Sequence, residues 1–107
     1  MALGSKKNVR WKKQENEIAD KVGGKVSKAS GASYQKADVR KFGIVRVECK
    51  STSKKSFRVD EKMIDKLERD CFGANEIPVI AIEILNGKRK VYVIPDYVLD
   101  FLLLRVD

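Results

Sequence analysis

The segment from Val79 to Ile84 places the tightest limit on the fold, because five of its six residues are apolar. A short apolar run without polar alternation is typical of a strand that is covered on both faces. Pro78 leads into the run, and Asn86-Gly87, a dipeptide typical of a type I′ hairpin, follows it. Residues 90–94 are therefore expected to return antiparallel, within a layered α/β fold.

Periodicity and turn residues predict the remaining elements. Gly23-Gly24 ends a first helix, Asp60 is a favourable N-cap for a second helix, and Gly73 ends it. The predicted elements, in chain order, are helix 9–22, strands 25–28, 39–41 and 43–50, helix 61–72, strands 79–84 and 90–94, and a helix that starts at Pro95-Asp96. This order, α-β-β-β-α-β-β-α, predicts one α/β domain over residues 9–107, with a mixed central sheet flanked by helices. Residues 1–8 are expected to form a flexible basic terminus.

Charge and composition limit the function. The chain has 107 residues, a net charge of +8 and no histidine. A basic surface favours an anionic partner, above all nucleic acid, although a merely basic protein is the alternative. The absence of histidine excludes imidazole bases and histidine zinc sites, so catalysis would rest on carboxylates, lysine and metal.

The two cysteines and the apolar segments indicate the compartment. Cys49 and Cys71 have no metal-ligand spacing and are expected to be reduced core residues. No stretch has the length of a signal peptide or a membrane span. We therefore expect a soluble cytoplasmic protein without a membrane partner.

The candidate site is centred on Glu48, Cys49 and Lys50. Alternation along residues 43–50 places Glu48 and Lys50 on the same strand face. Asp38 begins the preceding strand, and antiparallel pairing through Gly43 would bring its carboxylate beside Glu48. Two carboxylates and an ammonium group suit phosphodiester hydrolysis with Mg²⁺, for which Mn²⁺ is expected to substitute.

The tripeptide alone carries little weight. The pattern acid-x-Lys occurs a second time at Asp60, Glu61 and Lys62, where a helix is predicted. A solvent-facing strand with cross-strand ion pairs remains the alternative interpretation of the first occurrence.

Further candidates flank this strand pair. Glu15 shares the apolar stripe of the first helix with Ile18 and Val22, and it either reaches towards the two carboxylates or lies at the edge of the stripe in contact with water. Two loops rich in hydroxyl groups, 29–36 and 51–56, are suited to contact a phosphate or are ordinary connections. The candidate DNA contacts are Ser30, Ser33, Lys36, Arg40, Thr52, Lys54 and Lys55.

The order of Glu15, Ser30-Gly31-Ala32, Asp38, Glu48-Cys49-Lys50 and the loop that follows resembles the PD-(D/E)XK nuclease superfamily. The similarity is greatest to the small Holliday junction resolvases of archaea and phages, the Hjc-like group. It implies a restriction-endonuclease-like fold over nearly the whole chain. Ala37 stands where the superfamily usually has proline before the metal-binding aspartate.

The resemblance also implies residue roles. Asp38, Glu48 and the main-chain carbonyl of Cys49 would hold the metal, and Lys50 would position the attacking water. Glu15 would bind or orient a second metal or its waters, and Ser30, or Ser33 in its place, would lie near the scissile phosphate.

The expected function is a metal-dependent, structure-selective DNA endonuclease, most similar to a junction resolvase that nicks branched double-stranded DNA as a homodimer. The alternatives are another nuclease of the superfamily, of nicking, repair or restriction type, and a non-catalytic basic protein that binds nucleic acid.

Overall fold

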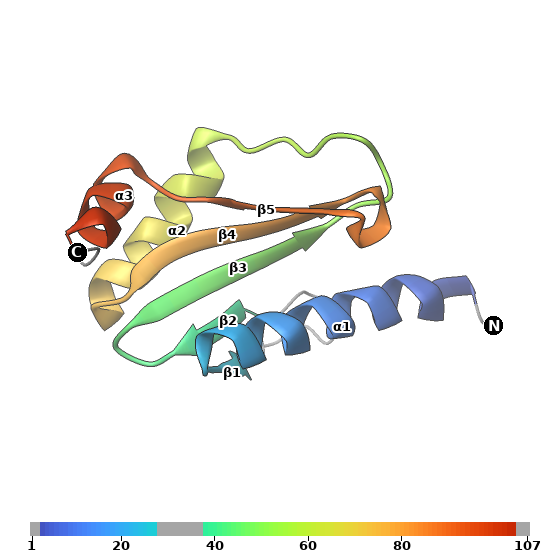
Figure 1. The fold of residues 1–107 in the computed structure, drawn as a ribbon, viewed down its shortest axis with the longest axis horizontal. Helices are drawn as coiled ribbons and strands as arrows, with labels where there is room; N and C mark the ends of the chain where they lie inside the picture. The colour runs from blue at the N-terminus through green and yellow to red at the C-terminus, as the bar shows by residue number, and fades with distance from the viewer. Residues whose placement is uncertain (1–2, 28–37, 105–107) are drawn as a thin grey trace.

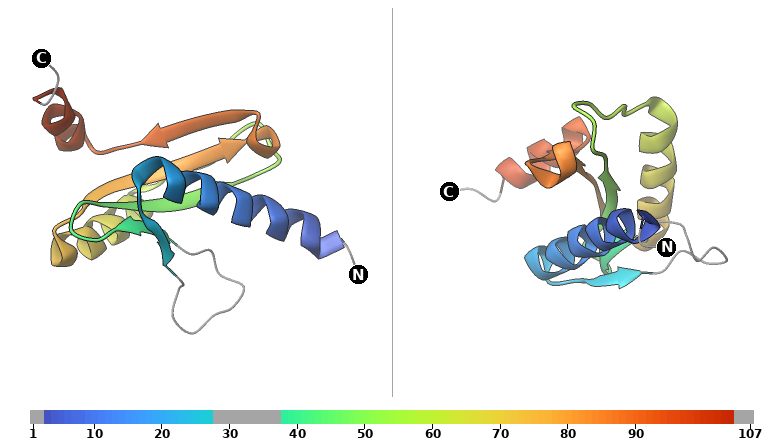
Figure 2. Two further views of the ribbon diagram at one scale, coloured as in Figure 1. Left: turned by 60° about the horizontal axis from the view of Figure 1, so that its bottom comes forward. Right: turned by 90° about the vertical axis from the view of Figure 1, so that its right-hand side faces the viewer.

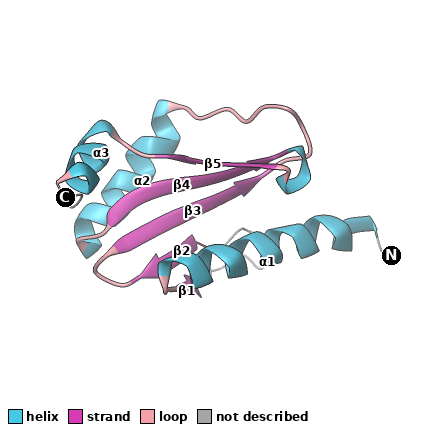
Figure 3. Cartoon of the chain, in the orientation of Figure 1, coloured by secondary structure: helices cyan, strands magenta, loops and turns pink. Residues whose placement is uncertain are grey.

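The computed structural model describes residues 3–27 and 38–104, with the backbone alone over residues 3–11. Its elements, in chain order, are α1 (Leu3–Val22), β1 (Lys25–Ser27), β2 (Asp38–Lys41), β3 (Val45–Ser51), α2 (Glu61–Ala74), β4 (Ile77–Ile84), the short 3₁₀ turn η1 (Leu85–Gly87), β5 (Arg89–Val93) and α3 (Asp96–Leu103). Figures 1 and 3 show these elements as a single layered domain. The predicted α/β class and element order are confirmed.

The five strands form one sheet in the order β1-β2-β3-β4-β5. All neighbouring strands are antiparallel except β3 and β4, which run parallel, so the sheet is mixed as predicted. The α2 helix forms the crossover between these two parallel strands. Figure 2 shows α1 and α2 on opposite sides of the strands.

Each face of the sheet has its own apolar cluster. Under α1, Ile18 packs with Val39, Val47, Cys49 and Ala81. Under α2, the clustered residues are Leu67, Cys71, Ile80 and Ile82. Consecutive residues of β4 therefore serve opposite cores, as predicted for a strand covered on both faces. Burying each large apolar side chain contributes about 1.5–3 kcal/mol, so the two clusters stabilise both layers.

The helix ends differ from the prediction in two places. The α1 helix begins at Leu3 instead of residue 9, so residues 3–8, predicted to be flexible, are helical. The α2 helix begins at its predicted N-cap, where the Asp60 carboxylate accepts a hydrogen bond from the Met63 N–H at 3.0 Å. It continues through Gly73 and ends at Asn75, whose left-handed φ of 57° supplies the C-cap that Gly73 was expected to provide.

The connection from β4 to β5 also differs. Ile84 pairs with Arg89, so four residues join the strands instead of the two of a type I′ hairpin. Leu85, Asn86 and Gly87 all have positive φ values. Asn86-Gly87 thus marked the turn correctly, but left-handed backbone at the preceding leucine lengthened it.

The α3 helix begins after Pro95, as predicted, and lies at one end of the sheet (Figure 1). Val98 is its buried residue, and the Tyr97 hydroxyl donates a hydrogen bond of 2.7 Å to Glu68 on α2. Burial and this hydrogen bond raise the pKa of Tyr97 to about 12. Within the described part of the chain, no helix combines the length and the apolar character needed to cross a membrane.

Candidate functional site

The β2–β3 hairpin positions the two central carboxylates. Its turn is closed by a 2.9 Å hydrogen bond from the Ile44 N–H to the Lys41 carbonyl, and Gly43 adopts a φ of 77° that favours glycine. Val39 pairs with Val47 across the antiparallel strands. Because the register continues by one residue on each strand, Asp38 lies opposite Glu48, as predicted from the sequence.

Side chains along β2 and β3 alternate between the two faces of the sheet, so the core residues lie on one face and the candidate site residues on the other. Val39, Val47 and Cys49 face α1 and are buried. Asp38 and Glu48 therefore point to the other face of the sheet, the face that α2 covers. Their side chains keep 26% and 15% of their surface exposed, so both carboxylates are accessible to a small ligand.

The electrostatic environment of Asp38 reflects this placement. Burial and the neighbouring charge of Glu48 raise the pKa of Asp38 above its ordinary value, while the cations Arg46 and Lys66 partly oppose the increase. Asp70 on α2 adds to it. A cation bound at Asp38 would relieve the unfavourable effect of the neighbouring Glu48 charge on the ionised form of Asp38.

Lys50 lies next to this pair. Its Nζ atom is 3.2 Å from Oε2 of Glu48, and its side chain remains 30% exposed. The predicted convergence of two carboxylates and an ammonium group is therefore present on one face of the hairpin. This arrangement can hold a hard cation and present a proton donor beside it.

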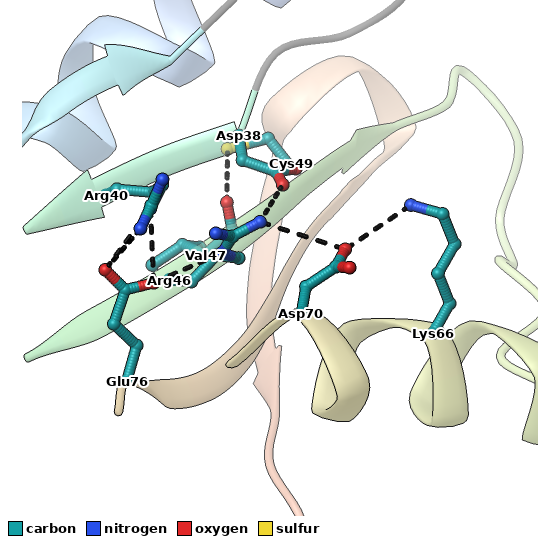
Figure 4. A network of polar contacts seen from close by, with 8 residues as sticks. All are labelled: Asp38, Arg40, Arg46, Val47, Cys49, Lys66, Asp70 and Glu76. Atoms are coloured by element: carbon teal, nitrogen blue, oxygen red, sulfur yellow. Dashed lines mark hydrogen bonds and ion pairs between the residues drawn. The ribbon is translucent and has the colours of Figure 1, made fainter. Parts of the chain in front are cut away.

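A second cluster, which the sequence did not predict, holds the hairpin in place (Figure 4). The fully buried carboxylate of Glu76 accepts hydrogen bonds from Arg40 (2.9 Å), Arg46 (3.2 Å) and the Gly43 N–H (3.1 Å). Burial alone would raise the pKa of Glu76, but these donors outweigh it and lower the pKa. Arg40, a candidate DNA contact, pairs with this buried acid and keeps 19% of its side chain exposed.

Arg46 connects this cluster to the candidate site. One of its terminal nitrogens lies 3.8 Å from Asp38 and 3.8 Å from Asp70. Asp70 in turn pairs with Lys66 at 3.6 Å. Figure 4 shows these alternating charges running from α2 to β2. Because Glu76 also holds Arg46, the cation beside Asp38 is fixed in position.

Gln14 is another residue that the sequence interpretation missed. Gln14 lies on α1, and its side chain is buried against the sheet. Its Nε2 atom donates hydrogen bonds to the carbonyls of Lys50 (2.9 Å) and Ala81 (3.3 Å). It therefore joins α1 to β3 and β4 at the residue that supplies the site's ammonium group. A second polar residue beside Glu15 on the apolar stripe of α1 is the sequence signal for this role.

Glu15 is buried on α1, as its position on the stripe predicted. The residues beside it, Gln14 and Ile18, pack on the face of the sheet opposite to Asp38 and Glu48. Among the residues that the structure describes, no three acidic or cysteine side chains gather closely enough to hold a metal ion. The structure thus brings Asp38 and Glu48 together but does not add Glu15 to them.

The loop after β3 begins at the site end of the hairpin. The Thr52 N–H donates to the Glu83 carbonyl at 2.9 Å, and the Leu85 N–H donates to the Lys54 carbonyl at 3.0 Å, so the loop is tied to β4 and η1. Thr52 Oγ1 accepts from the Lys54 N–H at 3.1 Å. The side chains of Lys54 and Lys55 are exposed, as expected for phosphate contacts.

The other predicted residues fall into two groups. Ser30, Ser33 and Lys36 lie outside the described residues. Cys49 and Cys71 are buried thiols, consistent with the predicted core role, and burial raises the pKa of Cys71 to about 11.

Comparisons of the chain with protein-family profiles, with curated proteins and with solved structures gave no match. The function is therefore inferred from the residues of this chain and from their geometry.

Proposed function

We propose that the protein is a metal-dependent DNA endonuclease, most similar in its site to a Holliday junction resolvase. The observation that carries this proposal is the strand register that sets Asp38 opposite Glu48, with the Lys50 ammonium 3.2 Å from Glu48. These three residue types, on one face of one hairpin, are the groups that phosphodiester hydrolysis needs when no histidine is present.

The donor set fits Mg²⁺ or Mn²⁺. Both ions prefer carboxylate oxygen, and a divalent charge would offset the repulsion that raises the pKa of Asp38. Asp38 and Glu48 would hold the ion, with the Cys49 carbonyl as the third protein ligand. When bound, the ion supplies positive charge at the phosphate and lowers the pKa of water.

The chain's own residues have distinct roles in the proposed reaction. Lys50 donates hydrogen bonds that orient the attacking water and offset negative charge at the phosphate. Water oxygen bonds to phosphorus and releases a proton to solvent, while the bond to the leaving sugar oxygen breaks and that oxygen takes up a proton from a solvent water, which gives a phosphate end and a hydroxyl end. Arg46, held by Glu76, keeps the Asp38 carboxylate in position.

DNA is the proposed substrate because the chain carries a net charge of +8. Lys54 and Lys55 are exposed on the loop that leaves β3 directly after the site, where they would contact the sugar-phosphate backbone. A four-way junction has two equivalent strands to cut, which a homodimer inside the cell would nick as a pair.

A second candidate is a basic nucleic-acid-binding protein without catalysis. The observation in its favour is that Arg46 and Lys50 already pair with Asp38 and Glu48. In such a protein the four side chains would only stabilise the hairpin.

The test uses labelled four-way junction, matched duplex and single strand, each with Mg²⁺ or with EDTA. The proposal predicts paired nicks in the junction with Mg²⁺ and none with EDTA. Equal cutting of duplex and junction would indicate another type of nuclease, and binding without any cutting would favour the second candidate.

A further inference from the structure

Arg46 is a largely buried cation beside the candidate site, and three carboxylates share it. Its Nε atom lies 3.2 Å from Oε1 of Glu76, and its Nη1 atom lies 3.8 Å from Asp38 and 3.8 Å from Asp70. The side chain is 15% exposed, so water screens its charge poorly. A cation in such a position needs negative charge from its protein neighbours.

Glu76 cannot balance Arg46 alone, because it also holds Arg40. The Nη2 atom of Arg40 lies 2.9 Å from Oε2 of Glu76, so one buried carboxylate faces two guanidinium groups. One positive charge therefore remains to be offset. Among the described residues, the other carboxylates within 4.0 Å of Arg46 are those of Asp38 and Asp70.

Asp38 has a competing role in the proposed function, where it holds a divalent cation together with Glu48. Lys50 already pairs with Glu48 at 3.2 Å. If Asp38 alone balanced Arg46, the two carboxylates would face two cations, and no net charge would attract a metal. If Asp70 balances Arg46, two carboxylates face only the Lys50 ammonium, and one negative charge remains for the metal.

The α2 helix positions Asp70 for this role. Leu67 and Cys71, its neighbours on the helix, are buried against the sheet. Figure 4 shows the Asp70 carboxylate pointing from α2 towards Arg46. Lys66 also pairs with Asp70, at 3.6 Å, but this lysine is 68% exposed, so its charge is largely solvated. The charge of Asp70 therefore acts mainly on Arg46.

We propose that Asp70 is a positioning residue of the candidate site. By balancing Arg46, it leaves the negative charge of Asp38 to a divalent cation and thereby sets the affinity for the metal. This inference rests on the proposed function, in which Asp38 and Glu48 hold that cation, and it adds a residue of α2 to a site built on the hairpin.

The test measures Mn²⁺ binding by calorimetry, without DNA, for wild type and for two variants that each remove one negative charge from α2. Asp70→Asn should weaken binding ~10-fold or more, as the loss of residues that support metal ligands does. Asp65→Asn is the matched control, because Asp65, like Asp70, pairs with a basic residue four positions away on α2. It should change the affinity less than ~twofold, since solvent and salt screen its charge.

Arg46→Gln tests whether Asp70 acts through Arg46. Removing this cation should tighten Mn²⁺ binding, and adding Asp70→Asn to it should then change the affinity less than ~twofold. An equal loss with and without Arg46 would mean that Asp70 acts directly on the metal, which overturns the proposal. So does an Asp70→Asn variant that binds Mn²⁺ as tightly as Asp65→Asn, a comparison that holds even if Arg46→Gln fails to fold.

Glu48→Gln separates a failure of this inference from a failure of the proposed function. If wild type binds Mn²⁺ no more tightly than Glu48→Gln, the cation site itself is wrong, and both proposals fall. If Glu48→Gln abolishes binding but Asp70→Asn does not weaken it, the role of Asp70 alone is wrong.

Discussion

Asp38 on β2 lies opposite Glu48 on β3, one position beyond the pairing of Val39 with Val47. Like charges at facing positions destabilise a strand pair. The cost is visible in the raised pKa of Asp38, for which burial is the first cause and Glu48 the second. In the proposed function, a cation bound by Asp38 and Glu48 offsets the repulsion between the two carboxylates.

Asp38→Asn should retain DNA binding or tighten it, because the change removes negative charge near the phosphate. Cleavage should fall by ~100-fold or more, since loss of groups that merely support metal ligands already costs 10–100-fold. Binding is measured by fluorescence anisotropy in EDTA and cleavage in Mg²⁺. Asp65→Asn, in an exposed ion pair on α2, is the control and should change neither.

Glu48→Gln should lower the pKa of Asp38 towards that of an ordinary aspartate, because one of the two main causes of the increase is removed. In wild type, protons should compete with Mg²⁺ at a higher pH than an unperturbed aspartate would allow, so metal affinity falls early on acidification. Carboxyl NMR titration of wild type and variant measures the shift. An unchanged Asp38 pKa in the variant would show that the two carboxylates do not interact.

Glu76→Gln should destabilise the fold by about 3–5 kcal/mol at pH 7, because Arg40 and Arg46 lose a buried charged partner. The folded-state pKa of Glu76 is lowered, so its contribution is present above the unfolded value, about 4.3, and is lost as pH falls through the folded value. The free energy of unfolding, measured with urea, should therefore differ between wild type and Glu76→Gln at neutral pH, and this difference should become smaller in acid. Asp65→Asn breaks an exposed ion pair and should lower the free energy of unfolding by only about 0.3–0.5 kcal/mol. If Glu76→Gln destabilised the fold by no more than this, the stabilising role of the Glu76 cluster would be contradicted.

Gln14→Glu should be more destabilising than Gln14→Leu. The carboxylate cannot donate to the carbonyls of Lys50 and Ala81 and would itself be buried. Leucine instead removes the Oε1 atom, for which the described residues offer no hydrogen-bond partner. We expect about 1–3 kcal/mol for leucine and more for glutamate, measured by urea unfolding. A glutamate variant as stable as the leucine variant, or more stable, would contradict the burial of this side chain against the two carbonyls.

Lys54→Ala and Lys55→Ala should each weaken binding equally for different DNA sequences and reduce the log-log salt slope by about one. Lys41→Ala is the control, because Lys41 lies at the turn end of the hairpin, away from Asp38. Salt titrations on two unrelated sequences separate the outcomes. A loss confined to one sequence would mean that these lysines contact bases instead of phosphates.

The pairing of Asp38 with Glu48 was predictable because it depends on local information. The alternation of β3 and the glycine turn determine the register within about ten residues. Glu76 could not be recognised in this way, since its partners Arg40 and Arg46 lie 36 and 30 residues away and residue 76 follows a helix cap without periodicity. The helix end predicted at Gly73 and the two-residue turn predicted at Asn86-Gly87 were each wrong in detail. Asn75 and Leu85 adopt left-handed backbone, which the amino-acid composition does not reveal.

The measurement that tests the central claim most directly is cleavage of a labelled four-way junction in Mg²⁺ by wild type and Glu48→Gln. The proposed function predicts paired nicks with wild type, none in EDTA, and none with Glu48→Gln even when anisotropy shows the junction bound. Wild type that binds the junction but cuts nothing in Mg²⁺ or Mn²⁺, or equal cutting by Glu48→Gln, would contradict it.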